Sequence, residues 1–174
     1  METLILKKPA ADLELAALDY KREFFEAGEL VIHGAAMLDS MEYGVWLKQT
    51  MENWEKATVH DNWVQASTFF AVRESDRRII GMIDIRHELN DFLAAYGGHI
   101  GYSVRPSERR KGYAAQMLNM ALEYAKDIGL VRVMLACNAD NEASRRTILK
   151  CGGMLEREFV YTDGKTVQVY WISL

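Results

Sequence analysis

Seven apolar residues between Ala114 and Ile128 form the repeat that most constrains the fold of this chain. They occupy positions i, i+3, i+4, i+7, i+8, i+11 and i+14, which is the spacing of one buried face of an α-helix. Gly129 follows as a typical helix terminator. Runs of β-forming residues precede the repeat at 99–105 and follow it at 130–137. A strand, a helix and a second strand in this order predict a crossover unit packed on a sheet.

The first part of the chain is expected to supply one strand and two helices. Residues 2–7 are a strand candidate, and apolar residues at helical spacing predict a helix over 13–27. A second helix is expected to open at Asp39, because Glu42 three residues later completes a capping-box pattern. This helix is expected to continue to Trp54.

Two hairpins and a further helix complete the pattern. The expected segments are 68–73 with 78–86, a helix over about 140–151, and 154–162 with 166–173. Asp163-Gly164 in the last hairpin predicts a type I′ turn. The order β-α-α-β-β-β-α-β-α-β-β therefore predicts one α+β domain over 1–174, an α/β sandwich in which helices flank a mixed, mostly antiparallel central sheet.

Composition removes several classes of protein. The 21 Lys and Arg residues against 25 Asp and Glu residues give a net charge of −4, which argues against a general nucleic-acid binder. Cys137 and Cys151 form no C-x-x-C motif, and no histidine pair has ligand spacing, so no metal site is expected. No window approaches the ~20 apolar residues of a membrane span, and no signal peptide is visible. We therefore expect a soluble, cytoplasmic protein without a membrane partner.

The segment that points to chemistry is the loop over 104–114, between a strand and the strongest helix. A helix start leaves backbone N–H groups unpaired at the positive end of the helix dipole. Gly112 lacks a Cβ, so an anion can approach the main chain closely there. Positive charge comes from Arg105, Arg109, Arg110 and Lys111. A diphosphate suits this combination, although a solvated cationic loop has the same composition, and no P-loop Gly-Lys-Ser/Thr follows.

Four segments together resemble the motifs of the GNAT superfamily of acyl-CoA-dependent N-acetyltransferases. In chain order they are Val104-x-Pro106, Arg109-x-x-Gly112-x-Ala114, Asn141-x-x-Ser144 and Lys150-x-Gly152. The second matches the signature Arg/Gln-x-x-Gly-x-Gly/Ala of that superfamily, and each segment falls on the element where the superfamily carries it. Because the order of elements also agrees, the resemblance covers essentially the whole chain. It implies the acyl-CoA N-acyltransferase fold and a single N-acetyltransferase domain.

The resemblance also implies an activity and a set of binding residues. It implies that acetyl-CoA donates an acetyl group to a primary amine by direct attack in a ternary complex. In such enzymes the strand before the loop splays from its neighbour at a bulge, and the pantetheine arm enters the gap. The main chain of Tyr102, Ser103 and Val104 is expected to bind that arm, with Asn141 and Ser144 beside it. The diphosphate is expected against Arg109, Arg110, Lys111, Gly112, Tyr113 and Ala114.

Proton transfer is where the sequence departs from the superfamily. Many members carry a tyrosine as general acid four residues after the position of Ser144, but this chain has Ile148 there. Ser144 is the nearest substitute. For the general base, His99 is the first choice, since an imidazole with an ordinary pKa of about 6.5 is largely neutral at cytosolic pH. Glu88 and Asp84 are the alternatives.

Two further classes of function stay open at this point. The missing tyrosine is compatible with a catalytically silent relative that binds acyl-CoA as a sensor. An RNA-binding module could use the basic loop, but the acidic net charge and the lack of interleaved aromatic residues argue against it. The expected partner is a small-molecule or peptide amine, not a nucleic acid. The acceptor's identity, other acyl groups and the oligomeric state, a homodimer included, are left open by the sequence.

Overall fold

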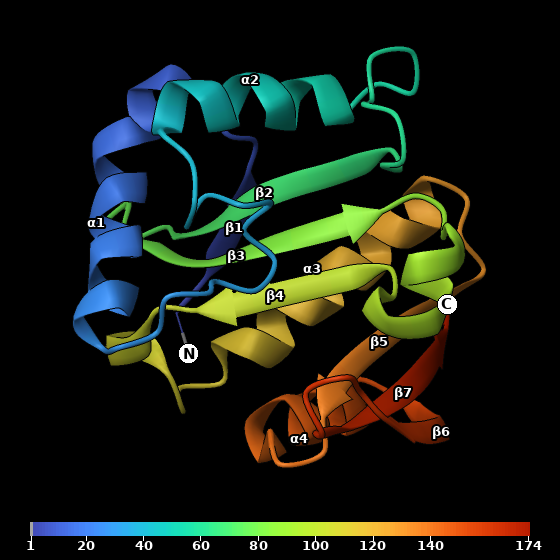
Figure 1. Ribbon diagram of the computed structural model, residues 1–174. Coiled ribbons are helices and arrows are strands. Elements are labelled where there is room, and N and C mark those ends of the chain that lie inside the picture. The colour runs from blue at the N-terminus through green and yellow to red at the C-terminus, as the bar shows by residue number, and fades with distance from the viewer. Residues whose placement is uncertain (1) are drawn as a thin grey trace.

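Two antiparallel sheets form the centre of the protein, as seen in a computed structural model that describes residues 2–174 (Figure 1). The first sheet has the order β1-β2-β3-β4 and consists of β1 (Leu4–Lys7), β2 (Ala66–Arg73), β3 (Ile79–Arg86) and β4 (Ile100–Val104). The second has the order β5-β7-β6 and consists of β5 (Arg132–Asn138), β6 (Met154–Val160) and β7 (Thr166–Ser173). The pairings between these named strands are all antiparallel.

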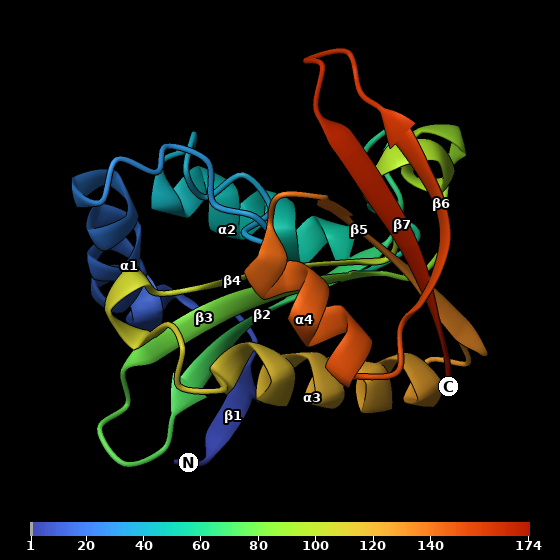
Figure 2. The same cartoon turned by 90° about the horizontal axis from the view of Figure 1, so that it is seen from below.

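Helices cover both faces of the first sheet. The helices are α1 (Glu14–Glu26), α2 (Tyr43–Asn53), α3 (Tyr113–Asp127) and α4 (Glu142–Lys150). Figure 2 shows α1 and α2 on one side of β2, β3 and β4, with α3 on the other side and α4 beside it. The predicted α+β class, with helices flanking an antiparallel sheet, is confirmed. Within residues 2–174 there is no helix of the length and apolar character needed to cross a bilayer.

Two hydrophobic cores result from this layering. Phe70 and Met82 of the sheet pack with Trp46 and other residues of α1 and α2, whereas the opposite face packs against Met117 and its neighbours on α3. Because both faces are covered, β2 and β3 are buried along almost their whole length, so they read in the sequence as continuous rather than alternating apolar runs.

The start of α2 differs from the prediction. The helix begins at Tyr43, and its N-cap residue Glu42 makes no capping hydrogen bond through its side chain. Asp39 does not cap the helix, because its Oδ2 accepts a hydrogen bond of 2.8 Å from the Ile32 N–H. The Asp39 carboxylate therefore stabilises the loop between α1 and α2. This hydrogen bond to the loop competes with helix capping for the same side chain.

The last hairpin also has a different turn from the predicted type I′. Only Gly164 has a positive φ, at 81°, whereas a type I′ turn needs Asp163 to be left-handed as well. The Tyr161 N–H donates to the Lys165 carbonyl at 2.8 Å, and the Gly164 N–H donates to the Tyr161 carbonyl at 2.9 Å. The hairpin therefore has a three-residue loop with glycine at its left-handed position.

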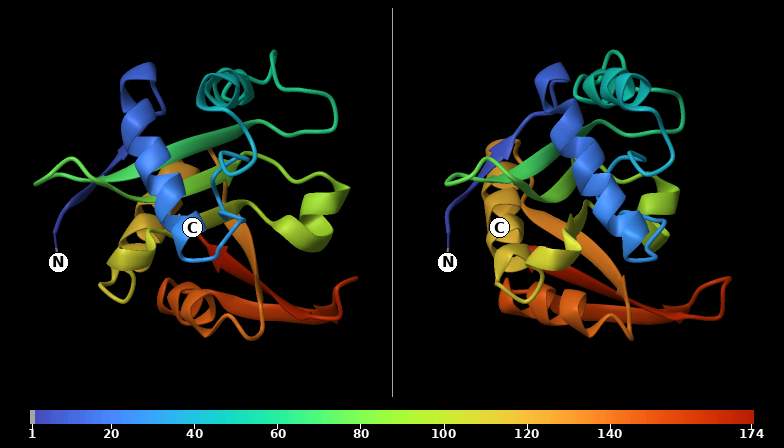
Figure 3. Two further views of the ribbon diagram at one scale, coloured as in Figure 1. Left: turned by 60° about the vertical axis from the view of Figure 1, so that its left-hand side comes forward. Right: turned by 90° about the vertical axis from the view of Figure 1, so that its left-hand side faces the viewer.

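The two sheets touch at the start of β4 and then separate. The His99 N–H donates to the Met134 carbonyl at 2.7 Å, and the Met134 N–H donates to His99 Nδ1 at 2.9 Å. Gly98 precedes this contact with φ at 70°, and a Cβ there would lie 2.5 Å from the Met134 carbonyl oxygen, so glycine is required. Figure 3 shows the second sheet, in orange and red, diverging from the first.

The separation occurs without the bulge expected in β4. The register between β3 and β4 is continuous from the pair Gly81–Val104 to the pair Ile85–Ile100. The register shifts of the described strands lie between β2 and β3, at Ala71 and Val72, and between β6 and β7, at Leu155 and Arg157. The gap beside β4 therefore arises because β5 pairs with β7 and not with β4.

Candidate functional site

The loop between β4 and α3 presents a series of unpaired backbone N–H groups. Gly112 is the N-cap of α3 and no side chain caps the helix. The first bond of the helix runs from the Gln116 N–H to the Gly112 carbonyl at 3.2 Å. Consequently, the N–H groups of residues 110–115 have no acceptor within residues 2–174. A ligand with several acceptor atoms can satisfy such groups together.

The backbone conformation directs these groups toward one side. Arg110 has φ at 62° and Gly112 has φ at 85°, and the left-handed Gly112 is followed by the right-handed helical residue Tyr113. Successive N–H groups in such a series form a concave anion-binding nest. Arg110 holds this conformation at an energetic cost, since a side chain disfavours the left-handed region. The loop is therefore shaped to bind an anion.

The cations predicted around this nest have different roles in the structure. The guanidinium of Arg105 is buried, and its Nη1 donates to Asp19 at 2.9 Å and to Glu23 at 2.8 Å. Its Nε donates to the Ile79 carbonyl at 2.8 Å. Arg105 thus fastens α1 to the sheet, which corrects its assignment as a source of charge on the loop.

The other three cations lie on the exposed part of the loop. Arg109 donates to both oxygens of Glu29 at 2.6 and 2.7 Å, and this pairing lowers the pKa of Glu29. Lys111 pairs with Glu108 at 2.8 Å. Arg110 makes no ion pair with any residue of 2–174 and is exposed. Arg110 is thus the side chain here that a bound anion can engage without breaking an existing pair.

The edge of β4 that faces the gap carries, at alternate residues, backbone groups that do not pair with β3. The Arg86 N–H donates to the His99 carbonyl and the Arg105 N–H donates to the Ile80 carbonyl, both at 2.8 Å. Odd-numbered residues of β4 therefore pair with β3, and the N–H and C=O groups of Tyr102 and Val104 point into the gap. Ser103, which the prediction included, pairs with β3.

The side chain of Ser103 also lies away from the gap. Its hydroxyl is 3.0 Å from the Tyr20 hydroxyl, on the face covered by α1. On the opposite face, the Tyr102 hydroxyl lies 2.9 Å from Ser144 Oγ at the start of α4. Burial raises the pKa of Tyr102 to about 12. This contact between positions 42 residues apart joins β4 to α4, and no sequence spacing indicates it.

The remaining α4 positions also have defined roles. Asn141 caps the helix, because its Oδ1 accepts from the Ser144 N–H at 3.1 Å. Its side-chain amide nitrogen has no partner within residues 2–174. Ile148 is buried in the larger core and lies so close to Gly153 that a Cβ there would be 2.4 Å from Ile148 Cγ2. Ile148, which occupies the position where many members of the superfamily have a tyrosine, therefore packs in the core and provides no polar group.

The geometry of His99 does not favour its expected role as a base. Its Nδ1 accepts the Met134 N–H, so the hydrogen of the neutral ring lies on Nε2. Burial, followed by Arg86 and Arg132, lowers the pKa of His99 to about 4. A nitrogen that already carries hydrogen cannot accept a proton from an amine. The imidazole joins the two sheets at the vertex of the gap.

The two carboxylate alternatives differ in their surroundings. Glu88 is exposed and lies 3.8 Å from Lys56 Nζ. Asp84 is buried on β3 opposite Gly101 of β4, and it accepts a hydrogen bond of 2.8 Å from Thr68. Burial raises the pKa of Asp84. Only Asp84 of these two lies against the middle of β4.

The loop between α1 and α2 covers that part of β4. Gly34 has φ at 69°, and a Cβ there would lie 2.3 Å from the Gly101 carbonyl oxygen. Gly101 in turn has no Cβ to repel Gly34. Two glycines thus allow the loop to pack directly on the strand beside Asp84.

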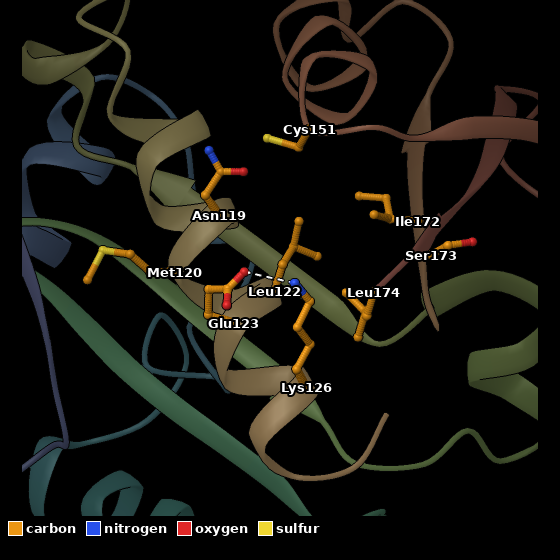
Figure 4. A pocket seen from close by; sticks show the side chains of 9 residues that line it. All are labelled: Asn119, Met120, Leu122, Glu123, Lys126, Cys151, Ile172, Ser173 and Leu174. Carbon is orange, nitrogen blue, oxygen red and sulfur yellow. Dashed lines mark hydrogen bonds and ion pairs between the residues drawn. The ribbon is translucent and has the colours of Figure 1, made fainter. Parts of the chain in front are cut away.

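One pocket of the protein lies away from these residues. It measures about 430 Å³ and is bounded by α3 and the end of β7. Figure 4 shows its lining, with Glu123 and Lys126 paired at its rim and Cys151 opposite. None of the predicted site residues lines this pocket. The candidate site is therefore the nest and the gap, not this hollow.

Comparisons with known proteins agree with the geometry. The chain matches the family described as "Acetyltransferase (GNAT) domain" over residues 4–154. It is 29% identical over 128 residues to the uncharacterised N-acetyltransferase YoaA of Bacillus subtilis strain 168, covering 66% of this chain and 71% of YoaA.

Solved structures of similar fold cover almost the whole chain. The microcin C7 self-immunity acetyltransferase MccE, in complex with acetyl-CoA and AMP, has a TM-score of 0.71 at 18% identity, covering 98% of this chain and 92% of MccE. A mutant of the spermidine N-acetyltransferase SpeG from Vibrio cholerae has a TM-score of 0.66 at 16% identity, covering 98% and 94%. At these identities the likeness shows the fold.

Proposed function

We propose that this chain, which belongs to the GNAT acetyltransferase family, transfers the acetyl group of acetyl-CoA to a primary amine. The observation that carries the proposal is the run of unpaired N–H groups over 110–115, beside the open edge of β4. A diphosphate has enough acceptor oxygens to satisfy them. The name of YoaA as an N-acetyltransferase and the acetyl-CoA bound to MccE support the choice of reaction and donor.

The donor is proposed to bind along the loop and the gap. The nest of unpaired N–H groups over 110–115 would hold the diphosphate, with the side chain of Arg110 as an additional donor. The free main-chain groups of Tyr102 and the N–H of Val104 would bind the amides of the pantetheine arm as a neighbouring strand does, whereas the Val104 carbonyl already accepts from Arg109 Nε at 3.1 Å. The amide nitrogen of Asn141, not used in capping, is a further donor for the arm.

The reaction is proposed to proceed by direct attack. The amine nitrogen forms a bond to the thioester carbon, the C–S bond breaks with its electrons on sulfur, and the amine proton leaves to a base. Holding the two reactants in line is worth about 7–11 kcal/mol in the best intramolecular cases. A main-chain N–H of β4 can stabilise the oxyanion. Asp84 is our choice of base, because its burial raises its pKa beside the middle of β4.

A thermal-shift assay followed by a thiol-release screen tests this function. At 100 times its dissociation constant, acetyl-CoA should stabilise the fold by about 2.7 kcal/mol, whereas adenosine should have little effect. Thiol release with a member of an amine panel then separates an enzyme from an acyl-CoA sensor of the same fold. The absence of any stabilisation at millimolar acetyl-CoA would refute donor binding.

A further inference from the structure

The hydroxyl of Tyr102 is the polar side-chain group that β4 places between itself and α4. It lies 2.9 Å from Ser144 Oγ and 3.4 Å from the Ser144 carbonyl oxygen. The main chain of the same residue faces the gap proposed for the pantetheine arm. Tyr102 thus has its main chain on the proposed path of the pantetheine arm and a hydrogen-bond donor in its side chain.

The reaction needs such a donor at this place. When the C–S bond breaks, sulfur acquires negative charge, and a hydrogen-bond donor aimed at it lowers the barrier. Ile148 cannot donate, because its side chain is apolar and buried in the core. Within residues 2–174, Tyr102 supplies the phenol that is hydrogen-bonded to α4.

We propose that the Tyr102 hydroxyl donates a hydrogen bond to the sulfur of coenzyme A as it becomes a thiolate, and that Ser144 positions this hydroxyl. The inference rests on the proposed function. The electron pair of the C–S bond goes to sulfur, the amine proton goes to the base, and the phenol keeps its proton. In this arrangement Ser144 Oγ donates to the phenol oxygen, and the phenol hydrogen turns from the Ser144 carbonyl, 3.4 Å away, to the sulfur.

The surroundings of Tyr102 are consistent with a phenol that donates a hydrogen bond and keeps its proton. The groups that face it are Ser144 and Thr147 of α4, Cys137 of β5 and Cys151 after α4. Burial raises the pKa of both thiols, so they bring no negative charge at neutral pH. Its own pKa of about 12 keeps the phenol protonated and makes it too weak an acid to surrender its proton to a thiolate.

The test is an ultraviolet pH titration of the thiolate of bound coenzyme A, with the spectrum of the free enzyme subtracted. It needs no acceptor amine. A hydrogen bond to the charged form favours that form, so bound coenzyme A should show about ten times more thiolate than free coenzyme A at a given pH below its pKa. Tyr102→Phe should remove this difference while the affinity for coenzyme A stays within about twofold.

Tyr43→Phe is the matched control, because its hydroxyl bonds to the Ala10 carbonyl at 2.6 Å, outside the site. It should leave the thiolate fraction as in the wild type. An equal thiolate fraction in the wild type and Tyr102→Phe, both with bound coenzyme A, would overturn the role of Tyr102 and leave the proposed function standing. Failure of the wild type to bind coenzyme A would overturn the proposed function, and this role with it.

Discussion

His99 should contribute to the pH dependence of the protein's stability, and His99→Asn should remove that contribution. The ring is buried, accepts the Met134 N–H at 2.9 Å and lies edge-on to Trp171 at a centroid distance of 6.0 Å. Protonation of Nδ1 would replace this hydrogen bond with a clash between two donors. Asparagine places an oxygen at nearly the position of Nδ1, so the variant keeps an acceptor without a titrating group.

The sign and size of this pH effect on the free energy of unfolding follow from two values of the His99 pKa, about 4 in the folded protein and an ordinary value of about 6.5 in the unfolded chain. Because the folded pKa is depressed, the unfolded chain binds more protons between pH 4 and 6.5, and stability falls as the pH falls through this window. Linkage gives a loss of about 2 kcal/mol between pH 7 and pH 5 and a ceiling of about 3 kcal/mol below pH 4.

Urea unfolding at pH 7 and pH 5 measures this contribution as a difference between proteins. Other groups titrate in the same range, so the quantity of interest is the pH-dependent loss in the wild type minus that in His99→Asn. Replacement of the exposed His33 by glutamine serves as the control. Equal losses in the wild type and His99→Asn would show that the imidazole is accessible and protonated in the fold. That result would restore His99 as a candidate base.

Three further predictions concern the site. Gly112→Glu should fold but show no thermal shift with acetyl-CoA. Gly129→Glu is the control and should retain the shift, because Gly129, with φ at 90° and open space around it, imposes similar backbone strain outside the nest. Binding of acetyl-CoA by both variants would exclude the nest as the diphosphate site. Asp84→Asn should reduce turnover at least about a hundredfold at unchanged KM for acetyl-CoA, and Glu88→Gln should be silent in the same assay; the reverse ranking would move the base to Glu88. Glu29→Gln should lower the Kd for acetyl-CoA severalfold by calorimetry, because the substitution releases the Arg109 guanidinium, which Glu29 binds at 2.6 Å. Weaker binding of acetyl-CoA would instead show that the Glu29–Arg109 pair shapes the site.

The sequence predicts the elements whose signals are local. The helix over 113–127 follows from apolar periodicity and a terminal glycine, and it agrees with the prediction to within about a residue. The two hairpins also agree, because each joins neighbouring β-forming runs through a short turn. Asp39 shows the limit of this reasoning, since its carboxylate can accept from the start of a helix or from a loop, and in the structure it accepts from the Ile32 N–H of the loop.

The parts of the site that sequence reasoning missed depend on contacts between distant residues. The charge of Arg105 is visible in the sequence, but its burial between Asp19 and Glu23 requires α1 to cross the end of β4. The pair Tyr102–Ser144 and the acceptor role of His99 Nδ1 likewise form only when the two sheets meet. Motif spacing assigns a residue to an element; only the packing decides which way its polar atoms face.

Arg109 connects the two halves of the proposed site. Its side chain reaches from the anion-binding nest to Glu29 after α1, and its Nε donates to the Val104 carbonyl at 3.1 Å on the gap side of β4. The same segment between α1 and α2 continues to Gly34, which packs on Gly101. An exposed pair of this kind contributes about 0.2–1 kcal/mol, less than a charge-assisted pairing with a diphosphate can supply. A diphosphate bound in the nest would therefore compete for Arg109 and change how the segment between α1 and α2 is held over β4, where the proposed function places the amine.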